Sequence, residues 1–144
     1  MDLLSMSVRA EFGARRIYVI REHTTFEPRR FHGFVLYLAG ACEYVYEMSS
    51  FVATAGSFLL LPKGLRYSIH PAALDSSCLL INFDADFAGP CRPVFRDLEA
   101  PEKVKRHFDM AIQATNRDEQ NRRALIFAAL YQIIAQVEAP SRYL

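Results

Sequence analysis

Hydrophobic and polar residues follow two different patterns along this chain. In the first part, short apolar or alternating runs are separated by turn-forming residues, and Val, Ile, Tyr and Phe dominate the runs, as is typical of strands. The candidate strands are residues 16–21, 33–38, 42–48, 58–61, 66–70 and 78–83. Strands that recur at this spacing predict a sandwich or a barrel.

Helical spacing replaces this pattern after Gly89, the last glycine of the chain. Pro101 and Glu102 are typical of a helix start, because proline is tolerated there and an acid favours the positive end of the helix dipole. An apolar stripe then follows at Val104, Phe108, Ala111 and Ile112. We therefore expect a β-domain over residues 1–98 and a helical segment over residues 99–144.

A second helix is predicted over residues 119–137, with Pro140 ending it. One face carries Phe127, Leu130, Ile134 and Val137, and the opposite face is also rich in apolar residues. Such a helix must be buried on more than one side. Packing against the strands and contact with a second subunit both remain open.

Residues 56–67 hold the clearest turn signal of the chain. Gly56 opens a short apolar run, and Pro62 and Gly64 close it, because proline fixes φ and glycine tolerates a positive φ. The stretch predicts a buried strand between two turns.

Composition excludes several classes of protein. The chain has 144 residues, enough for one domain of ordinary size, with 17 basic against 16 acidic residues. A nearly neutral chain lacks the basic surface expected of a nucleic-acid-binding protein. There is no apolar run long enough to span a membrane and no signal-peptide pattern at the N-terminus. The three cysteines, Cys42, Cys78 and Cys91, are odd in number and lack the spacing of metal ligands. We expect a cytoplasmic protein.

The 56–67 stretch resembles the second motif of the cupin barrels, in which a glycine and a Pro-x-Gly turn precede a metal-binding histidine. The histidine position holds Tyr67, and the first-motif ligand positions counted from Gly40 fall on Tyr46, Met48 and apolar residues. Zinc, iron or manganese needs nitrogen, sulfur or carboxylate ligands. The resemblance therefore implies a cupin barrel with no metal and no other cofactor.

A barrel followed by two helices resembles the N-terminal half of AraC-type transcriptional regulators. The matching residues are 29–38, Gly40, 56–67 and 80–83. The resemblance implies a mainly β fold, a cupin-like double-stranded β-helix or jelly-roll barrel followed by two α-helices. It further implies a homodimer that senses a small molecule, with a carbohydrate as one candidate, and signals to a helix-turn-helix DNA-binding domain outside this chain.

Candidate site residues follow from the alternation of the strands in this register. The expected inward-facing side chains are those of Tyr44, Tyr46, Met48, Tyr67 and Ile69, which would line an apolar lumen with hydroxyl groups. Arg30 and His32 are further ligand-binding candidates for a polar or anionic group. The expected dimer contacts are Phe127, Leu130, Tyr131 and Ile134. The alternative for the lumen is that these side chains simply fill it.

No catalytic residue is assigned, and two rival functions stay open. A small metal-independent cupin enzyme, such as a sugar isomerase or epimerase, would need an acid/base pair in the barrel, which His32 or His70 could form with an inward tyrosine. The other rival is an interaction module that only dimerises.

Overall fold

The computed structural model describes residues 2–117 and 120–139, apart from the side chains of residues 19 and 20. A short 3-10 turn, η1 (Leu3–Ser5), precedes nine strands in the described part. The strands are β1 (Ser7–Ile20), β2 (Thr24–Phe26), β3 (His32–Ala39), β4 (Ala41–Tyr46), β5 (Ser49–Thr54), β6 (Ser57–Leu61), β7 (Tyr67–Pro71), β8 (Ser76–Asp86) and β9 (Val94–Asp97). Two helices follow, α1 (Pro101–Arg117) and α2 (Arg122–Val137).

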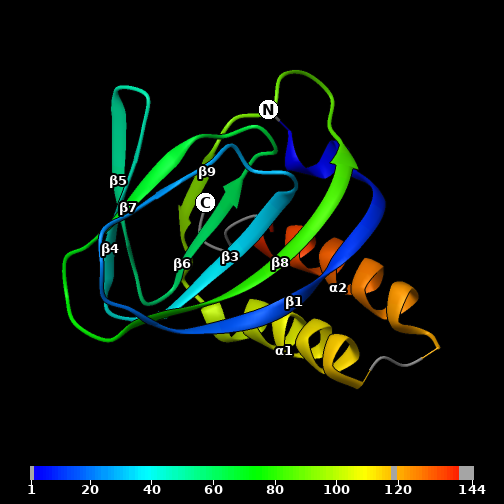
Figure 1. Ribbon diagram of the computed structural model, residues 1–144. Coiled ribbons are helices and arrows are strands. Elements are labelled where there is room, and N and C mark those ends of the chain that lie inside the picture. Colours follow the sequence, from blue (N-terminus) through cyan, green and yellow to red (C-terminus); the bar gives the residue numbers. More distant parts are fainter. Residues whose placement is uncertain (1, 118–119, 140–144) are drawn as a thin grey trace.

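The strands form two antiparallel sheets that face each other (Figure 1). The five-stranded sheet has the order β1-β8-β3-β6-β9, and the four-stranded sheet has the order β2-β7-β4-β5. Apart from the β4–β5 hairpin, neighbours in each sheet are not consecutive in the sequence, as in a jelly roll. The expected cupin-like β-fold with two C-terminal helices is confirmed.

The central strands of the five-stranded sheet are buried on both faces. In β3, Phe34 and Leu36 belong to the core on the helix side, whereas Val35 and Tyr37 belong to the core between the sheets. Successive side chains alternate between faces, so a strand covered on both sides reads as an unbroken apolar run. This is why residues 33–38 and 58–61 stood out in the sequence.

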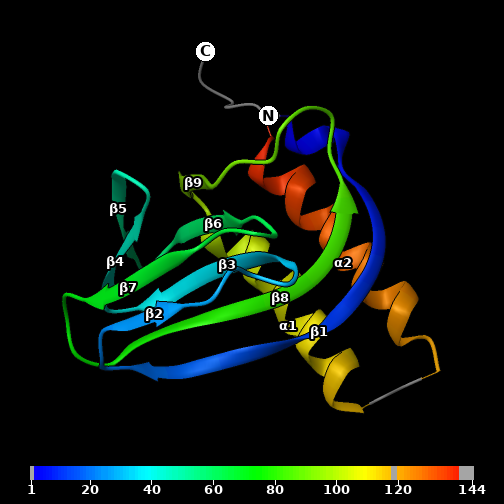
Figure 2. The same cartoon turned by 45° about the horizontal axis from the view of Figure 1, so that its top comes forward.

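Both helices pack on the outer face of the five-stranded sheet and form a third layer (Figure 2). Helix α1 turns Val104, Phe108 and Ala111 toward the sheet, as the stripe predicts, and all three are buried. Helix α2 packs against α1 and β1. The expected start of the second helix at residue 119 and its stop at Pro140 lie outside the described residues.

Three strands were missed in the sequence, and β1 is longer than expected. Strand β1 begins at Ser7. Its first half was not predicted, because bulges near Ala10 and Gly13 break the alternation of side chains there. Strands β2 and β9 are short, and β5 is exposed along most of its length. In the described part of the chain, no helix is long and apolar enough to cross a membrane.

The Pro-x-Gly turn has the expected geometry. The Leu65 amide donates to the Pro62 carbonyl at 3.1 Å, and Gly64 has a φ of 86°. The turn is bound to the segment before β3, because the Gly64 amide donates to Arg29 O at 2.8 Å and the Arg29 amide donates to Leu65 O at 3.0 Å. This pairing brings the Arg29 side chain to the space between the sheets.

Candidate functional site

The space between the two sheets, called the lumen below, is filled by side chains. Its core consists of Val35, Tyr37, Cys42, Tyr44, Ala53, Leu59, Leu61, Tyr67, Ile69, Cys78 and Leu80. Tyr44, Tyr67 and Ile69 point inward, as the alternation predicts, and all three are buried. The alternative that lumen side chains fill the barrel is therefore the one observed for this core.

Four aromatic rings form a continuous stack along the inner face of the four-stranded sheet, one ring from each strand. Phe26 stacks on Tyr67 with centroids 4.7 Å apart, Tyr67 on Tyr44 at 6.0 Å, and Tyr44 on Phe51 at 5.3 Å. The interplanar angles are 9°, 6° and 7°. Because both faces of Tyr44 and Tyr67 are covered by other rings, neither face is open to a ligand.

The hydroxyl groups of the lumen are paired. The Tyr37 and Tyr44 hydroxyls share a hydrogen bond of 2.7 Å, and burial raises the pKa of both phenols. Burial also raises the pKa of Tyr67, although the positive Arg29 guanidinium opposes this shift. All three phenols are consequently neutral hydrogen-bonding groups and not bases at neutral pH.

Arg29, and not Arg30, supplies the cation at the lumen. Its guanidinium donates to the Tyr67 hydroxyl at 3.1 Å, to the Phe31 carbonyl at 3.1 Å and to the Asn82 side-chain oxygen. A Cβ at Gly33 would lie 2.6 Å from Arg29 Nη2, so Gly33 leaves room for this cation. Arg30 is exposed, so the sequence placed the charge one residue too late. Arg29 and Arg30 precede β3, so the alternation of side chains along a strand does not predict which way either side chain points.

His32 lies on the other face of the sheet, and the expectation that it reaches the lumen is wrong. Its Nδ1 accepts the Lys63 amide proton at 3.0 Å, and its Nε2 lies 3.2 Å from the Ala85 carbonyl. It shares the helix-side face of β3 with Phe34. Burial lowers the pKa of His32, while the contact with Ala85 partly opposes this shift. Burial and the amide proton that Nδ1 accepts from Lys63 favour the neutral ring, and the two backbone contacts hold His32 in a structural position.

Met48 is the third wrong assignment, after Arg30 and His32. Strand β4 ends at Tyr46, Glu47 takes a positive φ of 51°, and Met48 is fully exposed in the turn to β5. The alternation ends where the strand ends, so the register counted from Gly40 does not extend to this residue.

Tyr46 is half-buried and lines a polar pocket at one end of the lumen. The pocket has a volume of about 580 Å³ and lies between the Pro-x-Gly turn, the β4–β5 turn and the segment before β9. Its charged lining residues are Glu47, Lys63 and Arg92. This pocket is the place where a hydroxyl-rich ligand could meet one of the predicted residues.

A larger groove lies where the edge strands β1 and β2 of the two sheets meet, with a volume of about 810 Å³. It is lined by Arg15, Arg16, Ile17, Arg21, Glu22, Thr24, Phe26 and Ile69. Ile17, Phe26 and Ile69 continue the lumen core and form an apolar floor. The sequence prediction did not include this groove, although Ile69 was among the inward-facing residues.

Arg15 is the cation of this groove that lies nearest the lumen. Arg15 and Ile17 pair with Leu80 and Cys78 on β8, which both face the lumen. Burial raises the pKa of the Cys78 thiol to about 12, and the Arg15 charge opposes that shift. Arg21 is engaged by Asp75 at 3.1 Å, whereas Arg15 has no ion pair within the described part of the chain.

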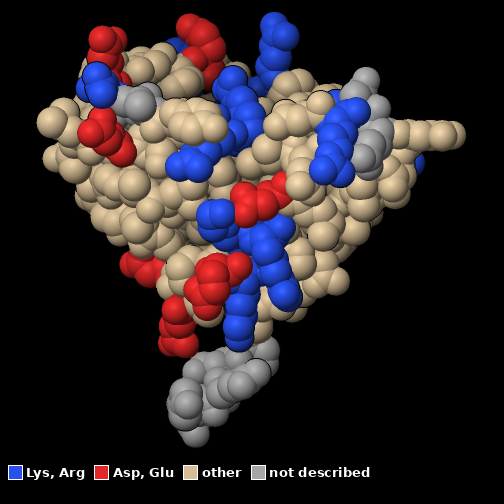
Figure 3. Space-filling model, turned by 90° about the horizontal axis from the view of Figure 1, so that it is seen from below, with Lys and Arg blue, Asp and Glu red and all other residues tan. Residues whose placement is uncertain are grey.

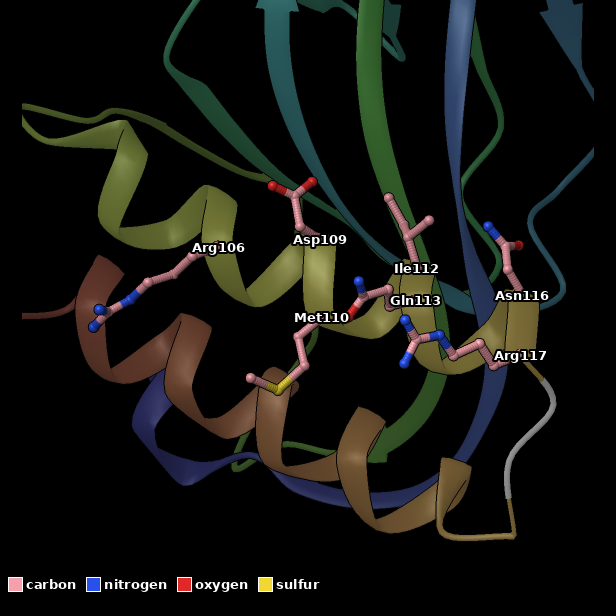
Figure 4. Close-up of a pocket in the computed structure, with 7 residues that line it drawn as sticks. All are labelled: Arg106, Asp109, Met110, Ile112, Gln113, Asn116 and Arg117. Carbon is pink, nitrogen blue, oxygen red and sulfur yellow. The ribbon is translucent and has the colours of Figure 1, made fainter.

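A third hollow, of about 480 Å³, runs along the outer face of α1 (Figure 4). Its lining residues are Arg106, Asp109, Met110, Ile112, Gln113, Asn116 and Arg117. Figure 4 shows Arg106 and Met110 extending toward α2. Basic and acidic side chains are interspersed over the face seen from below (Figure 3).

The expected dimer contacts divide into two groups. Leu130 and Ile134 are buried inside the subunit, in the core shared by the helices and the five-stranded sheet, so they cannot form the expected contact. Phe127 is half-buried beneath the Arg123 guanidinium, and Tyr131 is 41% exposed while its hydroxyl accepts the Val8 amide proton. A contact through Phe127 and Tyr131 remains a prediction.

Metal-binding and acid/base groups can be examined among the described residues. Among the described residues, no three His, Cys, Asp or Glu side chains gather in a way that could hold a metal ion. His70 points away from the lumen, on the face of β7 opposite Tyr67 and Ile69, and its ring stacks on His23 with centroids 4.1 Å apart. The buried side chains of the lumen exclude water. The histidines expected to form an acid/base pair do not face the lumen.

Comparisons with known proteins establish the fold. No family model matches the chain, and none of the curated proteins matches it. Unsaturated fatty acid-bound ToxT from Vibrio cholerae strain SCE256 is similar with a TM-score of 0.57 and 13% identity, over 85% of this chain and 53% of that chain. An apo ToxT variant from the same strain gives a TM-score of 0.56 and 12% identity, over 92% and 53%.

ToxT from Vibrio cholerae O395 is similar with a TM-score of 0.52 and 10% identity, over 91% of this chain and 54% of that chain. ToxT is an AraC-family regulator. The chain therefore has the cupin-like fold of the ligand-binding domain of such a regulator, as the sequence predicted. It spans about half the length of these solved structures.

Proposed function

We propose that this chain is the effector-binding and dimerisation region of an AraC-type transcriptional regulator. It binds a small molecule and signals to a DNA-binding domain outside this chain, in a cytoplasmic homodimer. The fold shared with ToxT supports the regulatory role. The domain division at residue 98 belongs to the same proposal.

The ligand we propose is an amphiphile with a negatively charged head and an apolar tail. The observation that carries this proposal is the β1–β2 groove, in which Arg15 lies beside an apolar floor of Ile17, Phe26 and Ile69. An apolar tail gains free energy when it leaves water, and a guanidinium forms charge-assisted hydrogen bonds with a carboxylate. The fatty acid bound to ToxT is a ligand of this chemical class.

A carbohydrate is the second candidate ligand class. The stacking of a sugar on Tyr44 or Tyr67 loses support, because other rings already cover both faces of each tyrosine. Tyr46 and the charged rim of the polar pocket are the groups that would serve a hydroxyl-rich ligand. Binding of sugars with loss on Tyr46→Phe would favour this class over the amphiphile.

We propose no enzymatic activity for the chain. A metal-independent isomerase or epimerase needs an acid/base pair in the lumen, and neither His32 nor His70 faces it. Turnover of a sugar-nucleotide panel would contradict this proposal.

Calorimetric titration with decanoate and with decanol tests the amphiphile. We expect decanoate to bind more tightly than decanol. Arg15→Ala should weaken decanoate binding by about tenfold or more, because a hydrogen bond to a charged group contributes roughly 1.5–3 kcal/mol. Arg9→Ala is the matched control, since Arg9 lies on the same strand and pairs with Asp86 away from the groove. Equal affinities of wild type and Arg15→Ala for decanoate would contradict the proposal.

A further inference from the structure

Strand β1 belongs both to the groove and to the helical layer. Arg15 and Ile17 line the groove, whereas Val8, Glu11 and Ala14 form hydrogen bonds with residues of α1 or α2. In Figure 1, β1 is the blue strand that passes over both helices before it reaches the edge beside the four-stranded sheet. One strand therefore touches the proposed ligand site and the elements that would carry its signal.

The first connection joins β1 to α2 through a shielded ion pair. Glu11 Oε1 accepts from Arg122 Nε at 2.8 Å, and Glu11 Oε2 lies 3.2 Å from Arg122 Nη2. The Glu11 side chain is 11% exposed, so water screens this pair less than a surface pair. The same carboxylate accepts the Gly13 amide proton at 2.8 Å. Glu11 thus fixes the bulge of β1 and the first turn of α2 together.

The second connection joins β1 to α1 one residue away from the groove. Thr115 Oγ1 accepts the Ala14 amide proton at 3.0 Å and donates to the Ala111 carbonyl at 2.8 Å. Ala14 is buried against the helices, and its neighbour Arg15 faces the groove. A displacement at Arg15 consequently reaches the Thr115 contact through a single peptide unit.

The segment between these contacts is bounded by irregularities of the sheet. Residues 14–17 pair in regular register with β8, and register shifts occur between Glu11 and Ala14 and between Ile17 and Ile20. Bulges interrupt the ladder and bend a strand locally. As an edge strand, β1 is hydrogen-bonded to β8 alone within its sheet. Residues 14–17 can therefore shift with less cost than a strand held on both sides.

We infer that residues 14–17 of β1 are a mechanical link through which occupancy of the β1–β2 groove changes the packing of α1 and α2. The inference rests on the proposed function for the nature of the ligand, but the link itself is a property of the fold. A ligand that draws Arg15 and Ile17 toward the groove pulls on the Thr115 and Glu11 contacts. By reciprocity, the packing of the helices sets the affinity of the groove.

Amide hydrogen exchange without any ligand tests the link directly. Ile17→Ala and Ile69→Ala both truncate the groove floor, but Ile69 lies on β7, which has no hydrogen-bonded connection to the helices in the described part of the chain. We expect Ile17→Ala to accelerate exchange of residues 126–130 of α2 about threefold relative to β3, through local opening. Ile69→Ala should leave that ratio unchanged, and Glu11→Gln should remove the difference between the two variants.

The inference is overturned if Ile17→Ala and Ile69→Ala change the ratio equally, or if neither changes it. Ile17→Val provides a milder form of the same comparison should Ile17→Ala unfold. Because no ligand is added, these outcomes do not depend on whether decanoate binds.

Decanoate provides the second measurement. Saturating decanoate should change exchange in α1 and α2 of the wild type, and Glu11→Gln should reduce this response and alter decanoate affinity about fivefold, within the usual range of coupling. Lys105→Ala is the control, because it removes a surface pair with Asp109 on α1 that does not touch β1. Decanoate binding with an unchanged response in Glu11→Gln would overturn the link and leave the proposed function intact.

Discussion

The buried hydroxyl pair of Tyr37 and Tyr44 gives a sharp prediction at the scale of single residues. Tyr44→Phe leaves the Tyr37 hydroxyl without its 2.7 Å partner. An unpaired buried polar group costs roughly 1–3 kcal/mol, so we expect a loss of that size in the free energy of unfolding measured with urea. The double variant Tyr37→Phe, Tyr44→Phe should lose less than the sum of the single variants. A strictly additive double variant would contradict the pairing.

His32 predicts how stability depends on pH. Burial lowers its pKa in the folded state, whereas the unfolded chain has the ordinary value of about 6.5. Above that value the unfolded and folded forms are both neutral, and below it the unfolded state binds more protons. The stability conferred by neutral His32 is thus complete above about pH 6.5 and is lost as the pH falls toward the lowered pKa.

We therefore expect the urea midpoint to fall between pH 8 and pH 5, and His32→Gln to show a smaller fall. His107 acts in the same direction, because burial and the neighbouring Arg106 lower its pKa as well. His107→Gln and the double variant separate the two contributions. An unchanged pH dependence in His32→Gln would argue against a pKa of His32 that burial lowers in the folded state.

At the scale of elements, Gly13 allows the contact between β1 and the helices. It has a φ of 88°, and an added Cβ would lie 3.2 Å from Arg122 Nη2. Gly89 has a similar φ of 83° with nothing within 4 Å, so Gly89→Ala tests the backbone strain alone. We expect Gly89→Ala to cost about 1–2 kcal/mol of unfolding free energy and Gly13→Ala to cost more. Equal losses would mean that Arg122 adjusts freely.

The sequence reveals elements where burial leaves a pattern and hides them where it does not. Strands β3, β6 and β8 were found because both of their faces are buried. Strand β5 and the first half of β1 were missed, since exposure and bulges remove the alternation. The alternation of side chains along a strand predicts that Tyr44 and Tyr67 point inward. It does not predict the direction of the Met48 side chain, because β4 ends at Tyr46.

The β1–β2 groove leaves no pattern along any single strand of the sequence. It forms where the edges of two sheets meet, so its residues come from β1, β2 and β7, which pair with different neighbours. A pattern along one strand cannot show which edge lies opposite. Extending the predicted strand back to residue 14 would have placed Arg15 and Ile17 on the lumen side by alternation. It would not have shown that they lie next to Phe26.

At the scale of the whole molecule, the burial of α2 changes how dimerisation must be tested. Leu130 is completely buried, so Leu130→Ala should cost about 2–5 kcal/mol of unfolding free energy whatever the oligomeric state. Ala128 is exposed on α2, next to Phe127. Ala128→Glu should leave the monomer stable within about 0.5 kcal/mol and shift sedimentation toward the monomer. Ala128→Glu that sediments as a dimer would place the contact elsewhere.

The ring stack along the four-stranded sheet also gives the protein an optical signal of its own. The chain has no tryptophan, seven tyrosines and eleven phenylalanines, so its near-ultraviolet circular dichroism arises mainly from tyrosine. Tyr44 and Tyr67 lie parallel in fixed, asymmetric surroundings and should dominate that spectrum. A spectroscopist can therefore follow any opening of the lumen without an added label, in the unmodified chain.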